Sequence, residues 1–85
     1  MKESNELKEF RQLISDYVGV DDLLETARRN FTPREAEIVQ FLESGLNPSE
    51  IAERLGVGGA KMSHTIHQII RKLRMTSIKI QKHDT

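Results

Sequence analysis

The sequence of 85 residues predicts an all-α fold, a small helical bundle that contains a tri-helical helix-turn-helix and one or two additional N-terminal helices. Two observations predict this fold. Apolar residues recur three and four positions apart along most of the chain, which is the period of an amphipathic helix. Capping sequences with proline, together with single glycines, divide this pattern into short segments. A chain of this length is expected to form one folded unit.

The segment 1–30 is expected to be a helical extension. An apolar stripe predicts a helix from about Asn5 to Val18. A shorter helix follows and ends near Asn30, with Asp21 and Asp22 at its start, where negative charge complements the helix dipole. The stripe of the first helix is large for a helix that only covers a small core, so it predicts a surface for dimerisation or partner docking. Its residues are Leu7, Phe10, Leu13, Ile14 and Tyr17.

Two capping sequences predict the next two helices. Thr32-Pro33-Arg34-Glu35 has the form of a capping box with proline at the first helical position, and Gly45 ends that helix. Asn47-Pro48-Ser49-Glu50 repeats the start signal, and the short helix that follows stops at Gly56. The small side chain of Ala52 would let the next helix cross closely. Helix, turn and helix in this order are typical of helix-turn-helix DNA readers.

A last helix is expected to begin near Gly59 or Ala60, and it completes a helix-turn-helix domain over residues 31–75. Its inner stripe consists of Met62, Ile66, Ile69, Ile70 and Leu73. Beyond Met75 the chain becomes β-branched and polar, so segment 76–85 is expected to be a basic tail that is frayed or extended. A short C-terminal strand is a weaker alternative.

Charge is divided unevenly, although the formal net charge is zero. Residues 1–57 hold 12 acidic and 7 basic residues, whereas residues 58–85 hold 6 basic residues and the single acid Asp84. This asymmetry favours an anionic partner for the C-terminal part.

The absence of cysteine excludes disulfides and thiolate chemistry. With no secretory signal and no apolar run of about 18 residues, we expect a cytoplasmic protein that makes no membrane contact.

The segment Phe31 to Leu73 resembles the LuxR/GerE-type helix-turn-helix. That pattern is matched without a gap by Phe31-Thr32-Pro33-Arg34-Glu35, by Ile51-Ala52-Glu53-Arg54-Leu55-Gly56-Val57 and by Ile69-Ile70-Arg71-Lys72-Leu73. The segment also resembles region four of bacterial sigma factors, which ends similarly to Arg71-Lys72-Leu73-Arg74. It departs from the LuxR pattern at Gly58, at Lys61-Met62 and at Thr65, and it lacks a fourth helix with dimer contacts. The resemblance implies a bacterial, DNA-binding regulator of transcription.

In such a domain, the helix from Ala60 to Leu73 would enter the major groove of double-stranded DNA. Gln68 can form two hydrogen bonds with adenine, and Arg71 can bind guanine or a phosphate. The other basic residues of this segment are expected to contact phosphates, namely Lys61, Lys72, Arg74 and Lys79. Amides at the helix starts of Ser49 and Ala60 offer further phosphate contacts. The full set of expected DNA-binding residues is Ser49, Ala60, Lys61, Ser63, His64, His67, Gln68, Arg71, Lys72 and Arg74.

A protein-interaction module is the alternative prediction, because domains that resemble sigma region four also bind RNA polymerase or another regulator. The acidic half of the chain would then dock on that partner.

A metal site is not expected, since His64 and His67 would need His83 or an acid as a third ligand. No catalytic arrangement is present in the sequence, so neither an enzyme nor a cofactor is expected.

Overall fold

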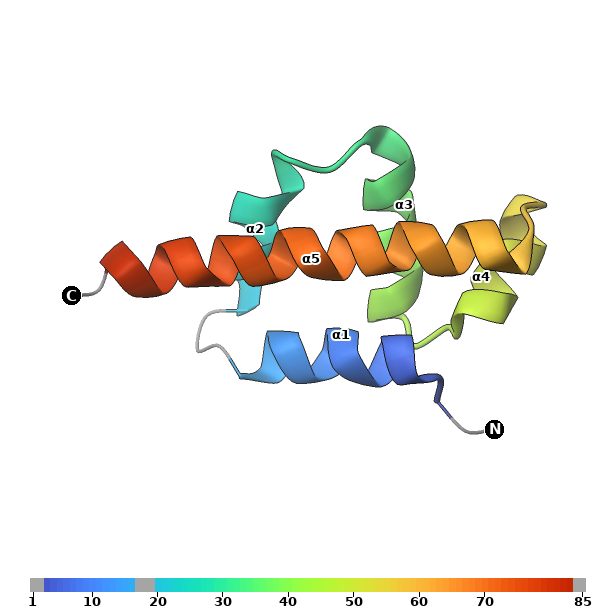
Figure 1. The fold of residues 1–85 in the computed structure, drawn as a ribbon, viewed down its shortest axis with the longest axis horizontal. Coiled ribbons are helices and arrows are strands. Elements are labelled where there is room, and N and C mark those ends of the chain that lie inside the picture. The colour runs from blue at the N-terminus through green and yellow to red at the C-terminus, as the bar shows by residue number, and fades with distance from the viewer. Residues whose placement is uncertain (1–2, 17–19, 84–85) are drawn as a thin grey trace.

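Five α-helices, and no strand, make up the part of the chain that the structure describes (Figure 1). The computed structural model describes residues 3–16 and 20–83, and it describes their side chains except at 20–22 and 79–83. The prediction of an all-α fold is confirmed. The helices are α1 (Asn5–Ser15), α2 (Val20–Arg28), α3 (Pro33–Glu43), α4 (Pro48–Leu55) and α5 (Gly59–His83).

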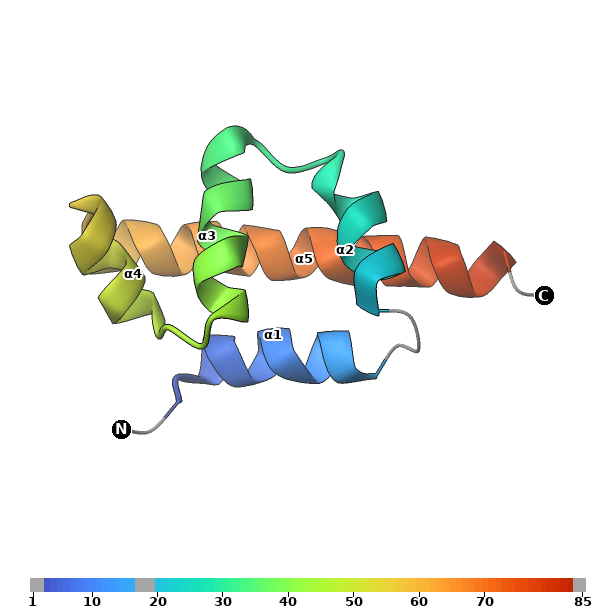
Figure 2. The same cartoon turned by 180° about the vertical axis from the view of Figure 1, so that it is seen from behind.

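The longest helix, α5, has 25 residues and runs the length of the molecule. The other four helices all pack against it, with α4 at its N-terminal end and α2 toward its C-terminal end (Figures 1 and 2). α1 lies along α5 and also contacts α2 and α3. This arrangement leaves one side of α5 uncovered along its length, as Figure 1 shows.

One continuous hydrophobic core holds the helices together. α5 contributes the stripe that the sequence predicts, and α1 to α4 contribute their own inner faces. The buried apolar residues are Leu7, Phe10, Leu23, Leu24, Ala27, Ile38, Val39, Leu42, Ile51, Ala52, Met62, Ile66, Ile69, Ile70 and Leu73. Because every helix supplies part of this core, each is fixed by tertiary packing rather than by helix propensity alone.

Hydrogen bonds at the helix starts confirm the predicted caps. Thr32 Oγ1 accepts the backbone N–H of Glu35 at 3.1 Å, and Glu35 Oε1 accepts the N–H of Thr32 at 2.9 Å, which completes the capping box of α3. At α4, Glu50 Oε1 accepts the N–H of Asn47 at 2.9 Å. Asn47 Oδ1 also accepts the N–H of Ser4 at 2.8 Å, so the starts of α1 and α4 are joined.

The turn between α4 and α5 depends on one glycine. Gly56 ends α4 with φ of 67°, in the left-handed region that a side chain strains. Gly58 does not share this requirement, because its φ is not positive. The carbonyl of Gly58 accepts the N–H of Met62 at 3.0 Å, which makes Gly58 the residue that precedes α5. The predicted start of the last helix at Gly59 is therefore confirmed.

The expectation of a frayed or extended segment after Met75 is wrong, because α5 continues to His83. Thr76 and Ser77 are buried, and their hydroxyls donate to the carbonyls of Lys72 and Arg74 within the helix. β-branched and polar residues disfavour a helix only weakly, and packing overrides that preference. The C-terminal half of α5 has α2 to pack against, and this contact holds it helical.

The expected dimer surface on the first helix also needs correction. Leu7 and Phe10 are fully buried in the core of the single chain, and Leu13 and Ile14 are half-buried against the same core. Leu7 and Phe10 are therefore not exposed to a partner. The stripe was too large for a core of three helices, but α2 and the long α5 extend the core. α1 ends at Ser15 rather than Val18, and Tyr17 lies outside the described residues.

None of the helices in the described residues combines the length and the apolar character that crossing a membrane would require.

Candidate nucleic-acid interface

The uncovered side of α5 carries a row of polar and basic side chains, which we call the outer face. A helix advances about 100° per residue, so these positions fall on one side, opposite the buried stripe. All of them are exposed. The outer face consists of Ala60, Lys61, His64, His67, Gln68, Arg71 and Arg74.

The edge of the outer face nearest α1 is held by polar contacts to that helix. Ser63, which is half-buried, donates its hydroxyl to Glu6 Oε2 at 3.0 Å. Arg74 forms an ion pair with Glu9. Both residues were expected to bind DNA, but in this structure each is paired with a carboxylate of the same chain.

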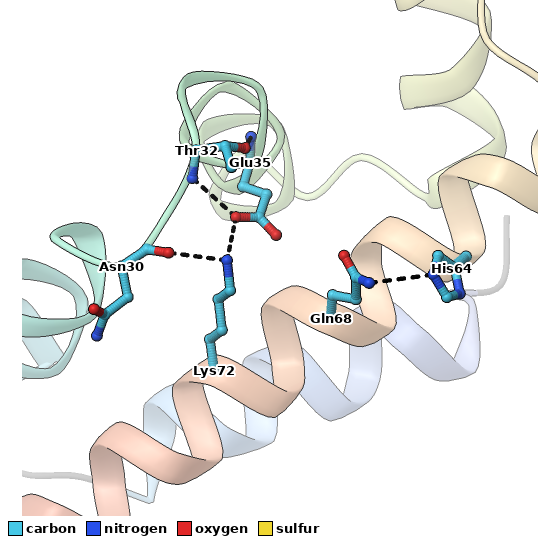
Figure 3. Close-up of polar contacts among 6 residues, drawn as sticks. All are labelled: Asn30, Thr32, Glu35, His64, Gln68 and Lys72. Carbon is cyan, nitrogen blue, oxygen red and sulfur yellow. Dashed lines mark hydrogen bonds and ion pairs between the residues drawn. The ribbon is translucent and has the colours of Figure 1, made fainter.

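The opposite edge is held to the start of α3 by Lys72. Its Nζ atom donates to Glu35 Oε1 at 2.6 Å and to the carbonyl oxygen of Asn30 at 2.9 Å (Figure 3). Figure 3 shows this ammonium between the end of α2 and the capping box of Thr32 and Glu35. Lys72 was expected to contact phosphate, but its charge already compensates a buried carboxylate.

The buried Glu35 carboxylate is held ionised by these contacts. Burial by itself would raise its pKa, but the hydrogen bonds from Lys72 and from Thr32, together with the charge of Lys72, outweigh burial. The pKa of Glu35 is therefore lowered from its ordinary value of 4.5. At neutral pH this network fixes the position of α5 relative to α3.

In the middle of the outer face, Gln68 and His64 are hydrogen-bonded to each other. Gln68 Nε2 lies 3.2 Å from His64 Nε2, one helical turn away (Figure 3). An amide nitrogen can only donate, so this contact is a hydrogen bond in the tautomer of His64 that leaves Nε2 free to accept. The contact leaves the amide oxygen and the second N–H of Gln68 available to another partner.

Three exposed side chains of the outer face are not held in this way. Among the described residues, Lys61, His67 and Arg71 take part in no ion pair or side-chain hydrogen bond. Two of the three are cations, one in the first turn of α5 and one three turns further along. They remain able to bind an anion without breaking a contact within the fold.

Arg34 is a further cation near this surface, and in the sequence it stands within the capping sequence that starts α3. Arg34 and Lys61 line one hollow of about 210 Å³, together with Ile38, Val57, Met62 and Thr65. Arg34 comes from the first turn of α3, and it also lies 3.3 Å from Glu37. Only the packing of α3 against α5 brings the two cations together, so spacing along the chain gave no signal.

The remaining predicted contacts lie at helix starts. Ser49 is exposed in the first turn of α4, and Ala60 is exposed in the first turn of α5. As for a metal site, the described residues contain no group of three His, Asp or Glu side chains that could hold an ion. The side chain of His83 is not among those described.

The chain matches no known protein family, no curated protein and no solved structure.

Proposed function

We propose that this protein is a DNA-binding regulator of transcription, in which α4, its glycine turn and α5 act as a helix-turn-helix. The outer face of α5 from Ala60 to Arg71 would lie in the major groove. The resemblance of Phe31–Leu73 to LuxR-type domains and to sigma region four motivates this proposal.

One observation carries the proposal, namely the charge of α5. Residues 59–83 contain six basic residues and no acidic residue, and a row of their polar side chains is exposed along one side of the fold. An α-helix with its side chains is about 10–12 Å across, which fits the major groove at about 12 Å. α5 itself carries no carboxylate that would repel phosphates, and Glu9 at the edge of the outer face is paired with Arg74. All the acidic residues of the chain lie outside α5.

Within this face, the proposed roles differ by residue. Gln68 and Arg71 present amide and guanidinium groups that can read base edges. Lys61 and Arg34 supply phosphate contacts that position the helix without specifying sequence. Lys72 and Arg74 are assigned to holding α5 in place, because each is paired with a carboxylate of another helix. The partner of Arg34 is the exposed Glu37 of the same helix, so that pair does not join two helices.

Selection of bound sites from a pool of random 30-base-pair duplexes tests the proposal. The wild-type protein should retain duplexes at low salt and enrich a common site. Gln68→Ala and Arg71→Ala should bind the pool but enrich no base at one or two positions. Retention of no duplex at 50 mM salt would refute DNA binding. If both variants enriched the same site as the wild-type protein, the assignment of base contacts to these residues would be refuted.

A further inference from the structure

Two large apolar side chains are exposed in the C-terminal half of α5. Met75 is 54% exposed and Ile78 is 51% exposed, and no other large apolar side chain among those described is exposed to this degree. They follow Arg71 by four and seven residues, so the three side chains lie on the same side of the helix. Ile78 is about 10 Å further along the axis than Arg71. This surface, Arg71, Met75 and Ile78, is here called the distal face.

A hollow lies beside the distal face. It has a volume of about 210 Å³ and is lined by Asn30, Lys72, Met75 and Thr76. It therefore lies between α5 and the turn that leaves α2. A protruding apolar side chain next to a hollow can interlock with a partner helix, and methionine adapts its shape to different partners.

The charge around the distal face selects among possible partners. Residues 71–82 contain five basic residues and no acidic residue, and two of the five, Lys72 and Arg74, are paired with Glu35 and Glu9. A second copy placed face to face would bring like charges together, which opposes self-association. The side chains of Met75 and Ile78 offer neither a charge nor a hydrogen-bond donor to a phosphate backbone. The main apolar stripe of α5 is already buried in the core, so little apolar surface remains to enter a lipid bilayer.

We propose that the distal face docks an acidic amphipathic helix of a partner protein. Apolar side chains of that helix would cover Met75 and Ile78, and its carboxylates would pair with Arg71, which has no ion pair with another described residue of the chain. This mode is a helix laid on an apolar surface with complementary charge. The proposal does not require the protein to bind DNA, and Arg71 is the residue that the distal face shares with the proposed DNA-binding surface.

Fluorescence anisotropy with two synthetic peptides tests this proposal. Each labelled peptide has 18 residues with leucine on one helical face, and the other positions are alanine and glutamate in the first peptide and alanine and lysine in the second. The glutamate peptide should bind the full-length protein, and the lysine peptide should not. Met75→Ser combined with Ile78→Ser should weaken binding at least tenfold, and Arg71→Ala several-fold. Lys8→Ala, an exposed cation of α1, should leave it unchanged.

Four results would overturn the proposal. The first is no binding of the glutamate peptide at low salt. The second is equal binding by the double serine variant, which would reduce the interaction to charge alone. The third is a dimer in sedimentation that Ile78→Ser dissolves, which would assign the distal face to a second copy. The fourth is binding to anionic phospholipid vesicles that the double variant abolishes. Thermal melts confirm that the exposed substitutions leave the fold intact.

Discussion

Lys72 Nζ lies 2.6 Å from Glu35 Oε1, and this contact joins two residues that are 37 positions apart in the sequence. Glu35 caps α3 through Thr32, and Lys72 belongs to the middle of α5. The capping box that starts one helix is therefore also the anchor for another. The side chain of Glu35 is only 5% exposed, whereas that of Lys72 is 34% exposed.

Lys72→Met should lower the free energy of unfolding at pH 7 by about 1–2 kcal/mol. The variant keeps the apolar stem of the side chain but leaves a buried carboxylate without its cation, and partial exposure of Lys72 moderates the loss. Urea denaturation measures the effect. Arg71→Met removes a neighbouring exposed cation as the control and should change stability by less than about 0.5 kcal/mol. Equal effects of the two substitutions would show that the Glu35 contact adds no stability.

The same contact predicts a pH dependence. The pKa of Glu35 is lower in the folded chain than its ordinary value of 4.5, so the folded state binds a proton less readily than the unfolded state. The resulting stability is fully present above pH 4.5 and is lost as the pH falls through the folded pKa. The difference between the wild type and Lys72→Met should accordingly shrink between pH 5 and pH 2. A difference that stays constant over this range would contradict the assignment.

The three glycines around the turn before α5 should respond differently to substitution. A Cβ atom at Gly58 or Gly59 would meet no atom within 4 Å, and neither residue has a positive φ. Gly58→Ser should be neutral or stabilising by a few tenths of a kcal/mol as a helix cap. Gly59→Ala should be neutral or stabilising by up to about 1 kcal/mol. Gly56→Ala has the same open space but φ of 67°, and should destabilise by about 1 kcal/mol. Thermal melts that rank the three in another order would contradict the described turn.

The C-terminal half of α5 can be tested with proline. Ser77→Pro should reduce helical circular dichroism and destabilise the fold by about 3 kcal/mol, because proline removes a backbone hydrogen bond and clashes with the preceding turn. Ser77→Ala serves as the control and should be close to neutral, since it loses only a bond to the Arg74 carbonyl. If residues after Met75 formed a frayed tail, proline would be tolerated as well as alanine.

Local patterns in the sequence predicted local structure well. The capping box of Thr32 and Glu35 depends on residues three apart, and the buried stripe of α5 follows from spacing within one helix, so both could be predicted. The partner of Glu35 could not be predicted, because the contact with Lys72 depends on how α3 and α5 pack. For the same reason, the sequence pattern predicted that Lys72 contacts a DNA phosphate rather than Glu35.

Three further differences have the same physical origin. Thr76 and Ser77 have modest helix propensity, yet they are helical because α2 covers that part of α5. Phe10 belongs to a stripe that is large for a small core, but the core also includes α2 and the stripe of α5 from Met62 to Leu73. Arg34 and Lys61 become neighbours on one hollow only after folding. Sequence spacing within a segment cannot report such contacts between segments.

The salt dependence of DNA binding tests the central claim most directly. Three cations near the outer face, Arg34, Lys61 and Arg71, are proposed to contact DNA. Neutralising about three phosphates should make log K fall with log[salt] at a slope of about −3. The measurement is anisotropy of a labelled 30-base-pair duplex pool between 50 and 300 mM KCl. Lys61→Ala should reduce the slope by about one unit, and the control Lys8→Ala should not change it. No binding at 50 mM KCl, or a slope that Lys61→Ala and Lys8→Ala alter equally, would contradict DNA binding by the outer face of α5.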